Sequence, residues 1–352
     1  MALFEVTAYD KVVYEQELKD FLPQRLFDVH THVWLDSHRL PGEGESEEKR
    51  TVSWPELVAL DNSIEDLQET YRLMFPGKEV NALMFLNNAC TEEANGYVAD
   101  CARRSGFPAL YFSHPSQSAD EVEEKIRAGG FLGIKSYLDF APAYIPSGEI
   151  RIFDFFPKHQ LERMDKLGAI VMLHIPRSGR LKDPVNLAQI AEIKREFPNV
   201  RLIVAHIGRA YVKEDIGNAF DLLDQFPDLL YDFTANCSEN VITEVLRHAG
   251  PKHVMFGTDM PILRMRCRRI EEDGTYINLI PPGLYGDPEQ DPHLREVSAQ
   301  EAEKITFFAY EELLALKRAA ETLNLSKADI EDILCNNAEN LIADAKRSIY
   351  GE

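Results

Sequence analysis

The stretch AIVMLHIPRSGRLKDPVNLAQIAEIKREFPNVRLIVAH, residues 169–206, shows the pattern that decides the fold. Residues 169–174 and 201–206 are runs of consecutive apolar residues, which is typical of strands buried on both faces of a parallel sheet. Between them, residues 187–199 carry a helical pattern that ends at Pro198. The stretch therefore predicts a strand–helix–strand unit, and each of its strands ends in a histidine.

The same unit recurs along the chain. Six further apolar runs occur at residues 25–32, 80–87, 109–114, 132–138, 229–235 and 253–259. Eight strands alternating with helices predict a closed α/β barrel, a (β/α)8 TIM barrel, with an open doubly wound sheet as the alternative. The 352 residues exceed the roughly 250 of a bare barrel, so we expect one barrel domain over residues 25–352 with insertions.

Three segments fall outside the repeat. Residues 1–24 alternate around a Tyr-Asp-Lys turn and predict a small N-terminal hairpin. Residues 36–79 form a polar, partly helical insertion, and residues 264–296 predict an irregular loop. Both insertions follow carboxyl ends of strands, where barrels carry their sites, so they are candidate lids or substrate walls. Residues 326–344 predict a closing helix.

Composition narrows the class of partner. The 38 basic and 59 acidic residues give a net charge of −21, which disfavours nucleic acid and anionic membranes as partners. We find no run of roughly 20 apolar residues and no signal peptide. Five cysteines without a CxxC pair indicate reduced thiols, so we expect a cytoplasmic protein. With nucleic acid and membranes disfavoured, the expected partner is a small-molecule substrate.

Polar residues end several of the predicted strands. His30 and His32 are two apart and share one face of the first strand. A single His-x-His more often marks a hydrogen-bonded strand end than a metal site. However, His174, His206 and Asp259 end the fifth, sixth and eighth runs. These ends converge in a barrel, so together they predict metal binding and catalysis.

These motifs resemble those of a known family. The matching pieces are DVHTH (28–32), LH ending at His174, AHIG (205–208), GTDMP (257–261) and NNAENLI (336–342). The chain resembles the amidohydrolase superfamily over residues 26–343. The similarity is greater to the amidohydrolase-related group, amidohydrolase family 2, which includes hydrolases and decarboxylases acting on small carboxylates.

The resemblance implies a ligand set. His30, His32, His174 and Asp259 match the ligands of one divalent ion, usually zinc, although nitrogen and oxygen ligands also admit Mn²⁺ or Fe²⁺. His206 matches a residue that polarises the substrate or passes a proton. In binuclear relatives His206 binds a second metal and a carboxylated lysine bridges the two. Lys135 stands at about that place, and we expect one metal.

Physical chemistry suggests the same roles. An ion with three nitrogens and one carboxylate keeps room for a water and lowers its pKa. Asp259 can accept the proton of that water, and His206 can donate a hydrogen bond to the developing oxyanion. Arg177 and Arg264 could hold an anionic substrate, with a solvated loop or surface ion pairs as the alternative. Lys135 and Tyr137 share an inward strand face and could line the pocket.

Three functions remain open from the sequence. The first is hydrolysis of an ester, lactone or amide carbonyl, and the second is non-oxidative decarboxylation of a small acid. Retention of both first-strand histidines mildly favours hydrolysis, because some decarboxylating relatives replace the first by glutamate. The third is an inactive barrel that binds a small acid, but no ligand of the set is missing. We expect a homodimer or higher homo-oligomer to be possible, since barrels often pair.

Overall fold

The computed structural model describes residues 3–38, 57–87, 90–285, 289 and 291–351. The parts of the three predicted segments that fall on the remaining positions lie outside the described residues. Among the helices described here, none combines the length and apolarity needed to cross a bilayer.

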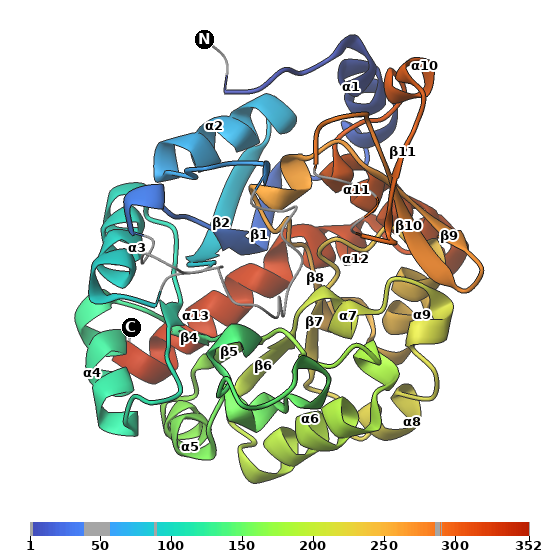
Figure 1. Cartoon of the computed structure of the whole chain (residues 1–352). Helices are drawn as coiled ribbons and strands as arrows, with labels where there is room; N and C mark the ends of the chain where they lie inside the picture. Colours follow the sequence, from blue (N-terminus) through green and yellow to red (C-terminus); the bar gives the residue numbers. More distant parts are fainter. Residues whose placement is uncertain (1–2, 39–56, 88–89, 286–288, 290, 352) are drawn as a thin grey trace.

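Eight parallel strands form the centre of the molecule (Figure 1). They are β1 (Arg25–His32), β2 (Glu79–Phe85), β3 (Tyr111–Phe112), β4 (Gly133–Lys135), β5 (Ile170–Leu173), β6 (Arg201–Val204), β7 (Leu230–Asp232) and β8 (Val254–Met255). β1 pairs with β2, and β3 to β8 pair in sequence order. A parallel bridge between Met84 and Ala109 joins β2 to β3, and the Val29 N–H donates to the Phe256 carbonyl at 2.8 Å beside β8. The strands therefore follow one another around a closed circle, which confirms the predicted barrel.

Helices surround the strands (Figure 1). Each strand is followed by one of α2 (Ile64–Met74), α3 (Glu92–Ser105), α4 (Ala119–Gly129), α5 (Lys158–Leu167), α6 (Pro184–Glu196), α8 (Phe220–Leu223), α9 (Glu239–Ala249) and α11 (Phe308–Leu323). Their starts follow local chemistry: Ser63 and Ser118 cap α2 and α4 through capping boxes, and Asp183 caps α6 with proline in its first turn. The remaining helices are α1 (Ala8–Val13), α7 (His206–Arg209), α10 (Ala299–Ala302), α12 (Lys327–Glu331) and α13 (Asn337–Tyr350).

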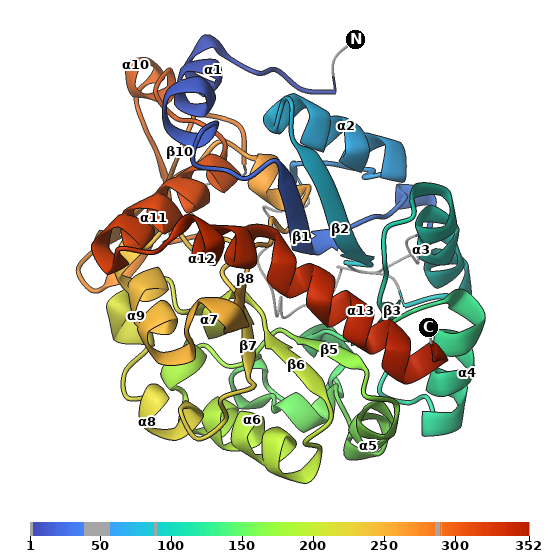
Figure 2. The same ribbon diagram turned by 180° about the vertical axis from the view of Figure 1, so that it is seen from behind.

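One end of the barrel is filled by the closing helix. Figure 2 shows α13 lying across the strands, and a π-helical turn, Asp332–Asn336, precedes it. Ala338, Leu341 and Ile342 of α13 belong to the same buried cluster as Phe27, Val29 and other inward-facing strand residues. The prediction of a closing helix is confirmed, and this packing leaves the carboxyl ends of the strands as the end where a site can form.

The N-terminal hairpin prediction was wrong. Residues 8–13 form the helix α1, and a π-helical turn, Tyr14–Leu18, continues it. Thr7 starts α1 with a capping box to Asp10, and Val13, Tyr14 and Leu18 are buried together. The apolar and polar residues alternate in this segment, which predicted strands, but the residues that become buried are spaced as on a helix.

The second insertion is also more regular than predicted. Instead of an irregular loop it forms a sheet of β9 (Arg268–Glu272), β10 (Thr275–Ile280) and β11 (Leu294–Glu296). β9 and β10 are antiparallel and joined by Asp273 and Gly274, whose φ angles are 51° and 74°. An Asp-Gly pair with two positive φ angles is the preferred two-residue hairpin turn, so the sequence did carry this signal.

Candidate metal centre

Three predicted ligands lie together at the carboxyl end of the barrel. Asp259 follows β8, and its N–H donates to the His30 carbonyl at 2.7 Å, which places its side chain beside β1. The Asp259 Oδ1 atom lies 2.8 Å from His32 Nε2 and 3.4 Å from His30 Nε2. His30, His32 and Asp259 offer ligand atoms that all lie within 4.8 Å of one another. The structure therefore brings these three residues into one cluster.

His206 enters the cluster from an unusual backbone turn. The four residues of α7, His206–Arg209, have φ angles of 56°, 50°, 57° and 57°, which lie in the left-handed region. Non-glycine residues rarely adopt this conformation, and it persists at functional sites when surrounding structure enforces it. The ring of His206 comes to 4.8 Å from the ring of His30, centroid to centroid.

His174 lies next to this cluster rather than within its tightest part. Its ring centroid is 5.3 Å from that of His206 and 5.0 Å from that of Tyr137. Its Nδ1 atom is buried and has no hydrogen-bond partner among the described residues. Burial, and then the positive charge of Arg209, lower the pKa of His174 well below its usual value. The ring is thus kept neutral, the form that can bind a metal.

The hydrogen bonds of the imidazoles fix which nitrogen faces inward. Nδ1 of His32 lies 3.2 Å from the Leu86 carbonyl, Nδ1 of His30 lies 3.0 Å from an Asp232 oxygen, and Nδ1 of His206 lies 3.1 Å from the Thr234 carbonyl. These partner oxygens only accept hydrogen bonds, so each Nδ1 carries the proton and each Nε2 keeps a free lone pair.

The donor set fits a divalent cation. The Nε2 lone pairs of His30 and His32 face the Asp259 oxygen, an arrangement of acceptors that needs a cation between them. Burial lowers the pKa of His32 and lowers that of His206 to about 4, so protons are poor candidates for this cation. Burial opposes ionisation of Asp259, but its contact with His32 and the nearby imidazoles outweigh this effect and keep its pKa low. Nitrogen and carboxylate ligands in this number suit zinc.

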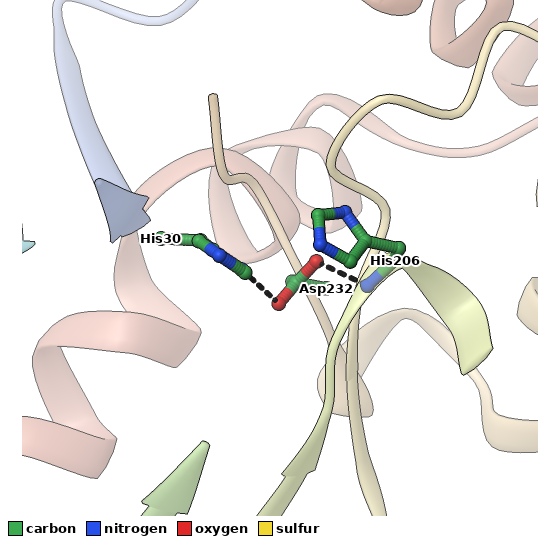
Figure 3. Close-up of side chains that lie close together, drawn as sticks. All are labelled: His30, His206 and Asp232. Atoms are coloured by element: carbon green, nitrogen blue, oxygen red, sulfur yellow. Dashed lines mark hydrogen bonds and ion pairs between the residues drawn. The ribbon is translucent and has the colours of Figure 1, made fainter. Parts of the chain in front are cut away.

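Asp232 is a residue of the site that the sequence analysis missed. It ends β7, is fully buried and lies between His30 and His206 (Figure 3). Burial raises its pKa, but the charge and hydrogen bond of His30 outweigh this and hold the pKa below its usual value. Its signal in the sequence was weaker than that of His206, because Asp232 lies in the middle of the seventh apolar run, residues 229–235, whereas His206 ends the sixth.

Lys135 and Tyr137 lie near the cluster. Lys135 ends β4, is 2% exposed, and its Nζ has no hydrogen-bond partner within the described part of the chain. Nζ lies 5.2 Å from the Tyr137 ring centroid and 5.7 Å from that of Phe85. Burial lowers the pKa of Lys135 to about 8, although the charges of Asp259 and Asp232 oppose the shift. A buried cation therefore faces the two carboxylates.

The two arginines predicted to bind substrate are engaged elsewhere. Arg177 donates to the carbonyls of Ile150 and Glu149 at 3.3 and 3.1 Å. Arg264 donates to the Val58 carbonyl at 3.1 Å, and its guanidinium lies 5.1 Å from the ring centroid of Phe4. The described contacts therefore connect neither side chain to the histidines.

A different arginine lies beside the cluster. Arg209 ends the left-handed turn that begins at His206. Within the described ranges, its Nη1 makes only long contacts, of 3.5 and 3.4 Å, with the carbonyls of Ile175 and Pro176. Its charge acts on both His174 and Tyr137. Sequence reasoning overlooked Arg209, although it directly follows the AHIG motif.

Comparison with known proteins decides the family. The family model described as amidohydrolase matches residues 27–342. The chain belongs to the amidohydrolase family. The resemblance inferred from the sequence is thereby confirmed, and this amidohydrolase is an enzyme of a group of metal-dependent hydrolases and decarboxylases. No curated protein gives a significant sequence match.

Several solved structures share the fold. An amidohydrolase from Burkholderia multivorans with bound zinc has a TM-score of 0.58 at 12% identity, covering 90% of this chain and 99% of the other. A probable 2-pyrone-4,6-dicarboxylic acid hydrolase from Acinetobacter baumannii with citric acid bound has a TM-score of 0.55 at 15% identity, covering 90% and 99%. A dihydroxybenzoic acid decarboxylase from Polaromonas with bound manganese and 2-nitroresorcinol has a TM-score of 0.54 at 15% identity, covering 93% and 100%. At these identities the likeness shows the fold of this amidohydrolase and not its substrate.

Proposed function

We propose that this amidohydrolase is a metal-dependent hydrolase that cleaves an ester, lactone or amide bond in a small substrate bearing a carboxylate. The observation that carries the proposal is the convergence of the His30 and His32 Nε2 atoms on the Asp259 carboxylate, with each Nδ1 already committed to an acceptor. The ligands would be His30, His32 and Asp259, with His174, which lies beside this cluster, as the fourth. Zinc is the first candidate, with Mn²⁺ or Fe²⁺ as alternatives.

One ion is favoured over two. His30, His206 and Asp232 form a second group of close ligand atoms. However, one Asp232 oxygen faces His30 Nδ1, and the other accepts the main-chain N–H groups of His206 at 2.8 Å and Thr234 at 3.2 Å. Main-chain donors at these positions cannot rotate away, so Asp232 is occupied as an acceptor and is a poor metal ligand.

The residues around the cluster would have different roles in proton transfer. When bound, a divalent ion polarises a carbonyl oxygen and lowers the pKa of a water. Asp259 would serve as the general base and acid, accepting a proton from an attacking water and returning it to the leaving group. The His206 Nε2 lone pair makes this residue a second proton acceptor, so it passes a proton rather than donating to the oxyanion. The Lys135 ammonium, which has no hydrogen-bond partner among the described residues, would donate to the developing oxyanion.

Positive charge at the mouth favours an anionic substrate. Lys135 is buried among the candidate ligands, and Arg209 lies beside His174 and Tyr137. In a chain with a net charge of −21, these two cations balance the nearby Asp232 and Asp259 carboxylates, and a bound divalent ion would make the local charge positive. The bound citric acid of the Acinetobacter neighbour supports an acid as the substrate.

Decarboxylation is the second candidate. The Polaromonas neighbour is a decarboxylase with the same fold, and a protonated Lys135 could deliver a proton to carbon after loss of carbon dioxide. Hydrolysis is preferred because both histidines of the first strand are present.

The zinc-loaded protein should be incubated with a panel of lactones and esters that carry a carboxylate, and separately with aromatic and unsaturated acids. Acid release measured by pH-stat from the first panel supports hydrolysis, and carbon dioxide release from the second supports decarboxylation. The His32→Ala variant, which removes a ligand, is the control for contaminating activity. Turnover of neither panel by zinc-, manganese- or iron-loaded protein would contradict both candidates.

A further inference from the structure

The Asp232 carboxylate connects two functional histidines from different strands. It lies at the end of β7 with no exposed surface. One oxygen is 3.0 Å from His30 Nδ1, and the other accepts the main-chain N–H of His206 at 2.8 Å (Figure 3). The Thr234 N–H donates to this second oxygen at 3.2 Å. Asp232 is thus held by the backbone on one side and meets a side chain on the other.

This geometry determines the tautomer of His30. An N–H of the main chain can only donate, so one Asp232 oxygen is fixed as its acceptor and the other is left for His30. An ionised carboxylate also only accepts, which places the His30 proton on Nδ1 and the lone pair on Nε2, 3.4 Å from Asp259 Oδ1. We propose that Asp232 is a positioning residue that holds His30 in its metal-binding tautomer and anchors the turn carrying His206. The proposal rests on the proposed function for the role of the metal.

The anchoring of His206 follows from backbone conformation. His206 and Ile207 have φ angles of 56° and 50°, which side chains with a Cβ atom disfavour. A strained turn of this kind persists only when neighbouring contacts enforce it. Its first N–H is bound by Asp232, and the His206 ring is held separately through Nδ1 to the Thr234 carbonyl. The main chain and the ring of His206 are therefore both fixed by the segment from Asp232 to Thr234.

The substitution Asp232→Asn changes the tautomer while keeping the shape. The asparagine oxygen can still accept from the His206 and Thr234 N–H groups. Its NH₂ group must then face His30 Nδ1, which becomes an acceptor, so the proton moves to Nε2 and blocks the metal position. Loss of a carboxylate behind a metal-binding histidine typically weakens metal affinity by about 10- to 100-fold. We expect a zinc Kd raised within this range.

A matched control is available in Asp215. It also accepts two main-chain N–H groups, those of Tyr211 at 3.0 Å and Val212 at 3.2 Å, and it pairs with Arg180. Asp215→Asn therefore makes the same isosteric change in a largely buried carboxylate that has no contact with the candidate ligands. We expect its zinc affinity to stay within about twofold of that of the parent protein.

The test uses three readouts on parent, Asp232→Asn and Asp215→Asn proteins. Zinc affinity is measured by competition with a chromophoric chelator, and the ligand field is followed by the absorption of the cobalt-substituted forms. The tautomer is read directly in metal-free protein by ¹⁵N NMR with labelled histidine at mildly alkaline pH. The His30 signals are assigned by their loss in His30→Gln. Asp232→Asn should move the His30 proton to Nε2, weaken zinc binding and alter the cobalt spectrum, whereas Asp215→Asn should change none of these.

The outcomes separate the two proposals. Unchanged zinc affinity in Asp232→Asn, or a weaker affinity without a change of tautomer, would overturn the positioning role. If the parent protein binds no divalent ion, the proposed function fails, while the NMR comparison still tests the control of His30 by Asp232. If Asp232→Asn does not fold, the parent decides alone: an Nε2-protonated His30 in the metal-free protein would refute the inference.

Discussion

Burial of the Lys135 ammonium predicts that removing it stabilises the metal-free protein. The side chain is 2% exposed, its Nζ lacks a hydrogen-bond partner among the described residues, and its pKa falls to about 8 from the 10.5 of a free lysine. Between these two pH values the unfolded chain binds the proton and the folded chain releases it. Stability therefore rises with pH through this window, and at neutral pH the folded state bears the full cost of the charge.

The size of the effect follows from the shift. A lowering of about 2.5 pKa units corresponds to about 3 kcal/mol of unfolding free energy at pH 7. Lys135→Met keeps most of the side-chain volume and removes the charge. We expect the variant to be more stable than the parent by up to about 3 kcal/mol near neutral pH, with the difference shrinking as the pH approaches 10.5. The same variant should lose most of its activity if Lys135 donates to the oxyanion as proposed.

The assay is urea unfolding of parent and variant in the presence of a chelator, at a series of pH values between neutrality and the pKa of free lysine. Lys194→Met is the matched control, because Lys194 is equally buried but pairs with Asp228 at 2.8 Å. It should lose stability or remain unchanged rather than gain. A Lys135→Met protein that is less stable than the parent at neutral pH, or a difference that does not depend on pH, would refute the argument.

Three further predictions concern the cluster itself. His32→Ala should weaken zinc binding by more than about tenfold. Zinc at a hundredfold excess over its Kd should raise the unfolding free energy of the parent protein by about 2.7 kcal/mol, measured by calorimetry against the chelated protein. His206→Asn should retain its zinc, measured by elemental analysis, but lose about 100-fold in kcat, since it removes a proton acceptor; loss of the metal would show that His206 is a ligand instead. Arg209→Gln should raise KM by about 10- to 100-fold for a substrate with a carboxylate and leave KM for its neutral ester unchanged; an equal effect on both would exclude a role in anion binding.

The barrel and most of the site could be predicted because they depend on burial patterns. Apolar runs such as residues 169–174 have no solvent-facing side, so they indicated parallel strands enclosed by helices. Closure of the barrel then forced the strand ends together, which brought His30, His32 and Asp259 into contact without any local signal that they would meet. The identity of the strand-end residues was therefore sufficient for this part of the site.

The parts that sequence reasoning missed depend on tertiary context. No propensity predicts that Ile207 adopts a φ of 50°, and this turn determines where Arg209 points. Asp232 lies inside its apolar run rather than at the end of it, and an aspartate in that place is interpreted correctly only when the end of β7 and its main-chain donors are known. The hairpin at Asp273 and Gly274 was a missed local signal, since its turn residues are explicit in the sequence.

Charge at the mouth of the barrel gives a last prediction, that anion binding depends on the metal. At neutral pH the carboxylates of Asp232 and Asp259, whose pKa values are held low, are ionised. The pKa of Lys135, lowered by burial to about 8, leaves it protonated, and Arg209 is always charged. Two negative groups against two positive ones leave the metal-free site without a net charge, and a bound divalent ion would make it positive. Benzoate, a simple carboxylate, should therefore bind to zinc-loaded protein in calorimetric titration and show no measurable binding to chelated protein. Equal binding to both forms would show that the arginine alone attracts the anion and that the ion has no part in substrate capture.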